Sequence, residues 1–82
     1  MVFSPKDKKE LREAIEIYCG NRDEGIEKYN EINSWDVSNI TNMSHLFERC
    51  REFNENIYNW DVSNVTNMES MFSGAQEFNQ PL

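Results

Sequence analysis

Trp60-Asp61-Val62-Ser63-Asn64-Val65-Thr66-Asn67-Met68 repeats, with one conservative change, the stretch Trp35-Asp36-Val37-Ser38-Asn39-Ile40-Thr41-Asn42-Met43 that lies 25 residues earlier. The agreement extends further, because 13 of 25 positions are identical when residues 32–56 are aligned with residues 57–81. Such a period is typical of repeat units that bury their apolar faces only against a neighbouring unit. We therefore predict a first repeat over residues 32–56 and a second repeat over residues 57–81, with Leu82 opening a third.

Each repeat is predicted to form one short strand and one short helix. Trp60 and Val62 alternate with polar residues, as side chains do along a half-buried strand. Thr66 precedes Glu69 by three residues, which is the spacing of a helix-capping box. Helical spacing of i, i+3, i+4 and i+7 follows at Met68, Met71, Phe72 and Ala75. Stacked units would place their strands in a parallel ladder, so the predicted fold class is an α/β repeat.

Residues 1–31 lack the repeat and are predicted to form an N-terminal helical cap. Ser4 and Pro5 suit the cap and first position of a helix over residues 4–20, which Gly20 would end. Asn21 and Glu24 predict the start of a second, shorter helix. The first helix carries one apolar face, made of Leu11, Ala14, Ile15, Tyr18 and Cys19. We expect this face to cover the exposed end of the first repeat.

Composition excludes several classes of function. The 82 residues carry a net charge of −7, which opposes binding to nucleic acid. The chain has no apolar run long enough to span a bilayer, so no membrane insertion is predicted. Its start, Met1-Val2-Phe3-Ser4-Pro5-Lys6-Asp7, turns charged without an apolar run, so neither a signal peptide nor a lipobox is recognised in this chain.

The cysteine and histidine content predicts no metal or cofactor. Cys19 and Cys50 belong to no Cys-x-x-Cys pair, and His45 is the single histidine. A structural zinc site needs four closely spaced ligands. Whether the two cysteines pair stays open, although Ala75 at the position of Cys50 in the second repeat favours two buried thiols.

The polar row of the predicted strands is the candidate binding surface. It consists of Asp36, Ser38, Asp61 and Ser63. Asp36 and Asp61 could hold calcium, but two carboxylates fall short of the six to eight oxygen ligands that calcium takes. Ser38, Asp36 and His45 are the residue types of a hydrolase triad, yet Ser70 replaces His45 in the second repeat. We therefore predict that the protein is not an enzyme.

The repeats resemble a known family. Trp60 to Met68, followed by Met71-Phe72, Ala75 and Phe78-Asn79, is similar to the 25-residue repeat domain of unknown function in mycoplasma-type lipoproteins, a relative of the BspA-like leucine-rich repeats. The first repeat, with Leu46-Phe47-x-x-Cys50, is closer still to the BspA pattern. The resemblance implies a right-handed, leucine-rich-repeat-like solenoid and a protein that is secreted or at the cell surface.

Together these observations predict a non-catalytic repeat scaffold for protein–protein or cell-surface interaction, as a fragment of a longer array. The alternatives are a calcium- or glycan-binding module and, with less support, a hydrolase. The expected partner is another protein or a surface glycan. Self-association through an open C-terminal edge is a further expectation, because unpaired edges invite pairing with another chain.

Overall fold

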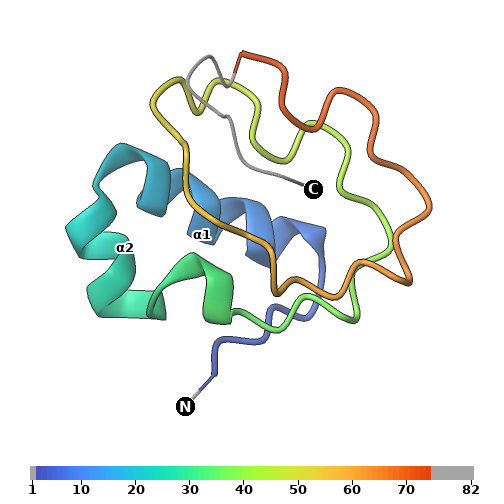
Figure 1. Cartoon of the computed structure of the whole chain (residues 1–82), viewed down its shortest axis with the longest axis horizontal. Helices are drawn as coiled ribbons and strands as arrows, with labels where there is room; N and C mark the ends of the chain where they lie inside the picture. The colour runs from blue at the N-terminus through green and yellow to red at the C-terminus, as the bar shows by residue number, and fades with distance from the viewer. Residues whose placement is uncertain (1, 75–82) are drawn as a thin grey trace.

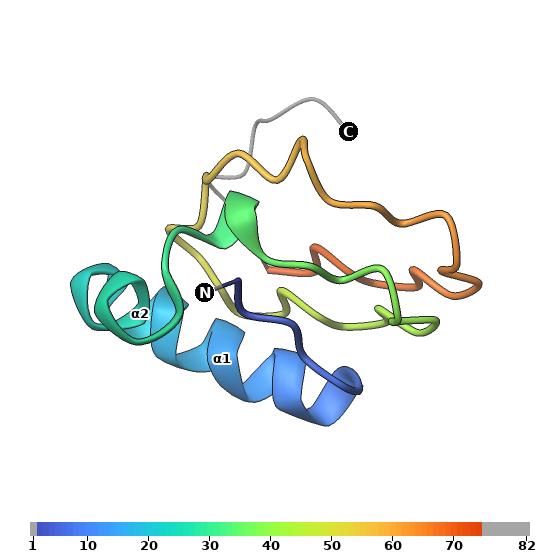
Figure 2. The same ribbon diagram turned by 90° about the horizontal axis from the view of Figure 1, so that it is seen from below.

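The structure, a computed structural model, describes residues 2–74. In order along the chain are helix α1 (Lys8–Gly20), helix α2 (Arg22–Tyr29) and the short 3₁₀ helix η1 (Ile32–Ser34). The rest of the described chain forms turns and irregular loops (Figure 1). In Figure 2 the loops of the second repeat lie over those of the first, and α1 lies on the opposite side of the first repeat.

Helix α1 begins three residues later than Ser4 and Pro5 predict. Its N-cap is Asp7, whose carboxylate accepts a hydrogen bond from Glu10 N at 2.9 Å. The Glu10 carboxylate in turn accepts from Lys6 N at 2.9 Å, so the two acidic side chains satisfy amides that the helix leaves free. The predicted apolar face is confirmed, since Leu11, Ala14, Ile15 and Tyr18 are buried.

Asn21 joins the two helices in the way that its position predicts. Its backbone N–H donates to Ile17 O at 2.9 Å, which ends α1, and its side chain accepts from Glu24 N at 3.2 Å, which starts α2. Gly25 lowers the helix propensity of α2, but it also lets α2 approach α1 closely. A Cβ at this position would lie 2.7 Å from the Cα of Tyr18.

The prediction of an α/β, leucine-rich-repeat-like solenoid is wrong. The described residues form two α-helices and no strand, and their single β-type pairing is an isolated parallel bridge between Asn42 and Asn67. Turns interrupt the expected strands: Trp60 N donates to Ile57 O, and Val65 N donates to Val62 O. The stretch between two such turns is too short to build a ladder.

The helix expected after each strand is also absent. In the first repeat, the N–H groups of Leu46, Glu48 and Cys50 each donate to the carbonyl three residues earlier. His45 and Arg49 have positive φ values of 59° and 69°, which no α-helix accepts. In the second repeat, Ser70 and Gly74 take the same place with 54° and 79°. Successive turns therefore replace the helix while keeping the buried spacing of Met43, Leu46, Phe47 and Cys50.

The two repeats are nonetheless bonded in register. The N–H groups of Met43, His45, Phe47 and Arg49 donate across the interface, each to a carbonyl 24 residues later, at 2.8 to 3.0 Å. The indole N–H of Trp60 donates to Ile32 O at 2.8 Å. Aromatic rings stack along the same direction, with centroids 6.4 Å apart for Trp35 and Trp60 and 5.3 Å apart for Phe47 and Phe72.

One hydrophobic core unites the helices and both repeats. It includes the inner face of α1, most apolar residues of the first repeat, and Ile57, Trp60 and Met71 of the second. Polar contacts also attach α1 to the first repeat. The Lys8 ammonium donates to Ser44 Oγ at 2.9 Å, and Arg12 donates to carbonyls in residues 45–48. The predicted contributions of Ala75, Phe78, Asn79 and Leu82 lie outside the described residues.

Candidate functional site

The candidate binding row consists of two copies of one local motif. Asp36 Oδ1 accepts from Ser38 N at 3.0 Å and from Ser38 Oγ at 2.6 Å. Asp61 Oδ1 accepts from Ser63 N and Oγ at the same two distances. Each aspartate therefore closes a turn with the serine two residues later, as Asp commonly does in loops.

These hydrogen bonds set the charge of the row. Donation from the Ser38 hydroxyl, and then from the Ser38 amide, holds the pKa of Asp36 below its ordinary value. Ser63 lowers the pKa of Asp61 in the same way. Partial desolvation and the negative charge of Asp61 oppose the shift in the pKa of Asp36. The row is a solvent-facing pair of anions at neutral pH.

The structure does not bring the three hydrolase candidates into one hydrogen-bonded chain. Ser38 Oγ donates to Asp36, whereas His45 Nδ1 lies 2.6 Å from Glu48 Oε2. Within residues 2–74, no group of three or more His, Cys, Asp or Glu side chains is arranged to hold a metal ion. Likewise, no helix in this part of the chain combines the length and apolar character that crossing a bilayer requires.

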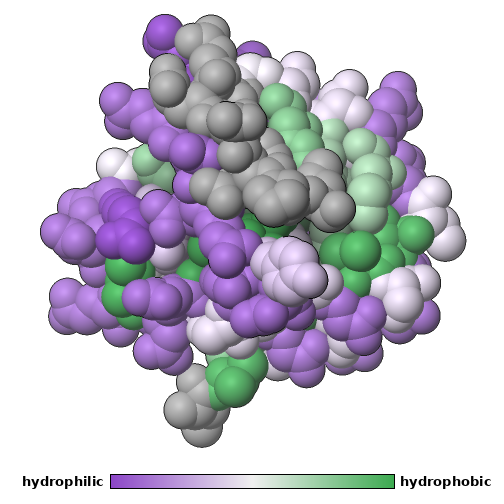
Figure 3. Space-filling view, viewed as in Figure 1, coloured by the Kyte–Doolittle hydropathy of each residue, from purple (hydrophilic) through white to green (hydrophobic). Residues whose placement is uncertain are grey.

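A second surface is apolar and open, and its residues other than Tyr58 occupy positions that the sequence pattern assigned to the core. Ile57, Trp60, Met71 and their neighbours line a cavity of about 170 Å³ on the second repeat. Tyr58, Val62 and Met68, which also line it, are 74%, 37% and 46% exposed. We call this surface the apolar face; its residues are Ile57, Tyr58, Trp60, Val62, Met68, Met71 and Phe72. Figure 3 shows apolar side chains gathered over this part of the molecule.

Comparison of the repeats explains why the apolar face is open. Val37 and Met43 occupy the positions of Val62 and Met68 in the first repeat, and both are almost fully buried. The second repeat covers the first, as the ring stacking and backbone hydrogen bonds show. One sequence signal marks the difference, because Tyr58 replaces Asn33 at an outward position.

The family described as Mycoplasma protein of unknown function, DUF285, matches residues 18–82. The chain belongs to this family. The match covers α2, both repeats and the end of α1, and it agrees with the mycoplasma repeat domain that the Trp-Asp-Val-Ser-Asn pattern resembles. No curated protein and no solved structure matches the chain significantly.

Proposed function

We propose that this domain is a non-catalytic protein-interaction module whose apolar face binds a segment of another protein. The observation that supports the proposal is the exposure of Tyr58, Val62 and Met68 around a preformed apolar cavity. Contiguous apolar surface of this kind is characteristic of interaction sites. Tyr, Trp, Phe and Met are also the residues most enriched where protein surfaces meet.

The negative charge around the apolar face favours a partner segment that is positively charged. Residues 52–82 contain acidic side chains and no Lys or Arg. Asp61 and Glu69 are exposed and lie in the same repeat as the cavity. We therefore expect a segment with apolar anchors for the cavity and flanking Lys or Arg side chains, since complementary charge favours encounter and disfavours wrong partners. A second acidic copy of this chain meets repulsion at the same rim.

Peptide display tests this proposal directly. The probe is a library of random peptides, selected on the wild-type chain and then measured against Val62→Asp and Met68→Asp. Both substitutions place a carboxylate in the apolar face at a side chain that is partly exposed, so the fold should tolerate them. Val2→Asp is the matched control, because Val2 is 58% exposed and lies outside the apolar face.

We expect enriched peptides to combine large apolar residues with Lys or Arg, to bind at micromolar affinity, and to lose at least tenfold in affinity to Val62→Asp but not to Val2→Asp. Peptides that bind both variants equally, or that carry acidic flanks, would contradict the proposal. Sedimentation at several protein concentrations tests whether a second copy of this chain binds the apolar face instead. Self-association that Val62→Asp abolishes would replace the foreign partner with a second copy.

We also propose a relationship to the BspA-like proteins, and with it a position at the cell surface. The support is the Leu46-Phe47-x-x-Cys50 pattern of the first repeat, and it concerns sequence kinship and not the fold. Antibody labelling of intact cells that express the natural protein tests the location. Labelling only after the cells are permeabilised would contradict it.

A further inference from the structure

The first repeat holds the second through its main chain. Its N–H groups at every second residue from 43 to 49 donate to carbonyls 24 residues later, at 2.8 to 3.0 Å. The isolated bridge between Asn42 and Asn67 shows that the two main chains run parallel here. Three carbonyls of the first repeat accept in turn from the second: Ile32 O from Trp60 Nε1 at 2.8 Å, Ser38 O from Asn64 Nδ2 at 2.7 Å, and Thr41 O from Thr66 N at 2.7 Å.

The second repeat presents the same backbone donors one period later. Met68 and Ser70 occupy the positions of Met43 and His45, and their N–H groups donate to no acceptor within residues 2–74. Both residues are exposed. The turn that aims these donors is preserved, because φ is 59° at His45 and 54° at Ser70. Two backbone donors are thus held in position at the apolar face.

The backbone acceptors recur as well. Ser63 O and Thr66 O are the equivalents of Ser38 O and Thr41 O, and neither accepts a hydrogen bond from the part of the chain that the structure describes. Both residues are exposed. Backbone groups without a partner at such an edge pair readily with another chain. Because these groups already have their positions, binding costs less in ordering.

One contact of the first repeat is not reproduced in the second. Asn33 Oδ1 accepts a hydrogen bond from Asn59 N at 2.9 Å, and Tyr58 stands at the position equivalent to Asn33. Tyr58 offers no amide oxygen there, but it adds an exposed ring beside the cavity. The apolar face therefore suits an occupant that resembles the repeat in its backbone and differs from it in its side chains.

We propose that the partner segment expected at the apolar face binds through its main chain, in the parallel register that the second repeat adopts on the first. Carbonyls of two alternate residues in the partner accept from Met68 N and Ser70 N, and its donors reach Ser63 O and Thr66 O. Main-chain pairing of this kind supplies affinity, and the apolar and basic side chains of the partner supply selectivity. The inference rests on the proposed function and adds the way in which that partner is held.

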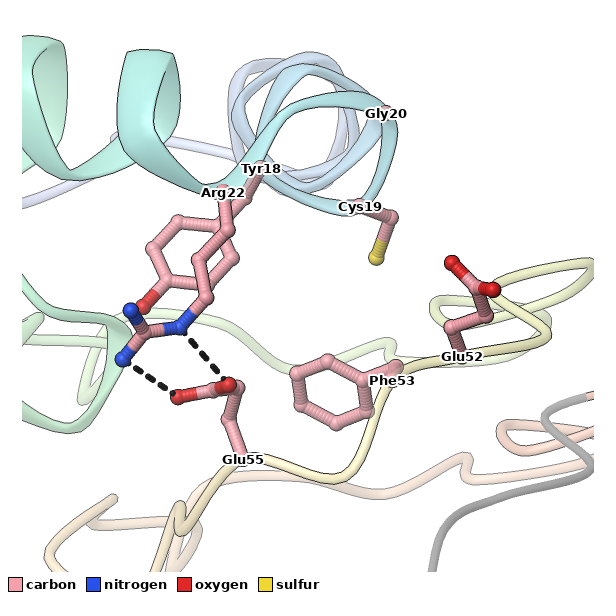
Figure 4. A pocket seen from close by; sticks show the side chains of 7 residues that line it. All are labelled: Tyr18, Cys19, Gly20, Arg22, Glu52, Phe53 and Glu55. Carbon is pink, nitrogen blue, oxygen red and sulfur yellow. Dashed lines mark hydrogen bonds and ion pairs between the residues drawn. The ribbon is translucent and has the colours of Figure 1, made fainter.

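A second cavity supplies a matched control. It lies between the end of α1, the start of α2 and residues 52–55, and its volume is about 230 Å³. Figure 4 shows Arg22 and Glu55 paired across it, at 2.8 and 3.2 Å. Arg22→Gln removes this ion pair and leaves every residue of the apolar face unchanged.

Hydrogen exchange tests the backbone contacts. The probe is the tightest-binding peptide from the display selection, added at saturation to the isotope-labelled full chain. We expect the N–H groups of Met68 and Ser70 to exchange about tenfold more slowly in the complex, and those of α1 at an unchanged rate. A peptide that loses affinity to Val62→Asp but leaves Met68 and Ser70 unprotected would overturn this inference, while the proposed function would stand. If no peptide binds, both fail.

Backbone esters in the same peptide locate the register, because an ester carbonyl is a weaker acceptor than the amide it replaces. We expect about fivefold weaker binding for each of two esters whose carbonyls lie two residues apart, and less than about twofold for the ester between them. Equal losses at all three positions, or none at any, would contradict the register. Arg22→Gln should bind the peptide as the wild type does; weaker binding would place the peptide at the second cavity and overturn the inference.

Discussion

Replacing Gly25 with alanine tests how tightly the two helices meet. The new Cβ would lie 2.6 Å from Cδ2, 2.7 Å from Cα and 2.9 Å from Cγ of Tyr18, all well inside ordinary van der Waals contact. The ring cannot simply rotate away. It packs edge-on to Trp35 at 5.7 Å, and its hydroxyl accepts a hydrogen bond from Ile32 N. The Cα belongs to the backbone of α1, so relief requires the helices to separate.

Two effects of opposite sign set the magnitude. Alanine is favoured over glycine in a helix interior by about 1 kcal/mol. Overpacking a close contact costs typically about 1–3 kcal/mol, and a clash with backbone belongs at the upper end of that range. We therefore expect Gly25→Ala to lower the free energy of unfolding by about 2 kcal/mol. With a urea m-value of about 1–3 kcal/mol per molar, the midpoint falls by roughly 1 M.

Gly20→Ala is the matched control, because a Cβ at this helix position meets nothing within 4 Å. It should leave stability unchanged or raise it by up to about 1 kcal/mol. The assay is urea unfolding followed by the fluorescence of Trp35 and Trp60. If Gly25→Ala proves as stable as the wild type while Gly20→Ala behaves as expected, the close helix contact is refuted.

Three further predictions concern the first repeat and the helices. Arg49→Gly should raise the free energy of unfolding by about 1 kcal/mol, because Arg49 holds φ at 69° where the second repeat already has Gly74; lower stability in thermal unfolding would contradict this. Arg12→Ala should lower the free energy of unfolding by about 2 kcal/mol, because it removes charged hydrogen bonds to backbone carbonyls. The exposed Arg22→Ala should cost less, because solvent screens its ion pair with Glu55, so equal midpoints in urea would be inconsistent with the contacts. Asp36→Asn should be less stable than the wild type at neutral pH, because a depressed carboxyl pKa stabilises the fold fully above the unfolded value of 3.8. The difference should shrink below pH 3.8 and vanish as pH falls through the lowered folded pKa of Asp36; a difference that persists unchanged from pH 7 to pH 2 in urea titrations would exclude this origin.

The helices and the likeness of the two repeats could be predicted from the sequence, because local chemistry determines both. The side chain of Asn21 caps α2 through Glu24 N, a contact that depends only on residues three apart. The Trp35 and Trp60 stretches give the same turns with the same Asp–Ser hydrogen bonds, since identical residues make identical local contacts. In both cases the deciding interactions lie within a few residues of one another.

The structure inside each repeat could not be predicted in this way. Met43, Leu46, Phe47 and Cys50 are all buried, and their spacing of three and four residues fits an α-helix as well as a train of four-residue turns. Positive φ decides between the two, and Arg49 gives no sign of it. Only Gly74, at the equivalent position of the second repeat, carries the usual signal.

The apolar face could not be predicted from the sequence either, because its exposure depends on packing between repeats. Val62 and Met68 match buried residues of the first repeat, so their pattern predicts core. Whether such a side chain is buried depends on the unit packed against it, which is not a property of its own position. The expected open C-terminal edge implied uncovered apolar side chains such as Phe72, but the exposure of Val62 and Met68 became visible only in three dimensions, although Tyr58 in place of Asn33 was a local indication.

The direction of the hydrogen bonds between the repeats has a consequence for how the molecule opens. Backbone and side-chain hydrogen bonds join residues 57–74 to the first repeat, where they end at residues between 32 and 56. The second repeat can thus detach as a unit while the helices stay packed on the first. Amide protons of Met43 and Phe47 would then exchange with solvent deuterium at the rate of this partial opening, ahead of those inside α1. Native-state exchange would resolve two levels of protection in a domain of this small size.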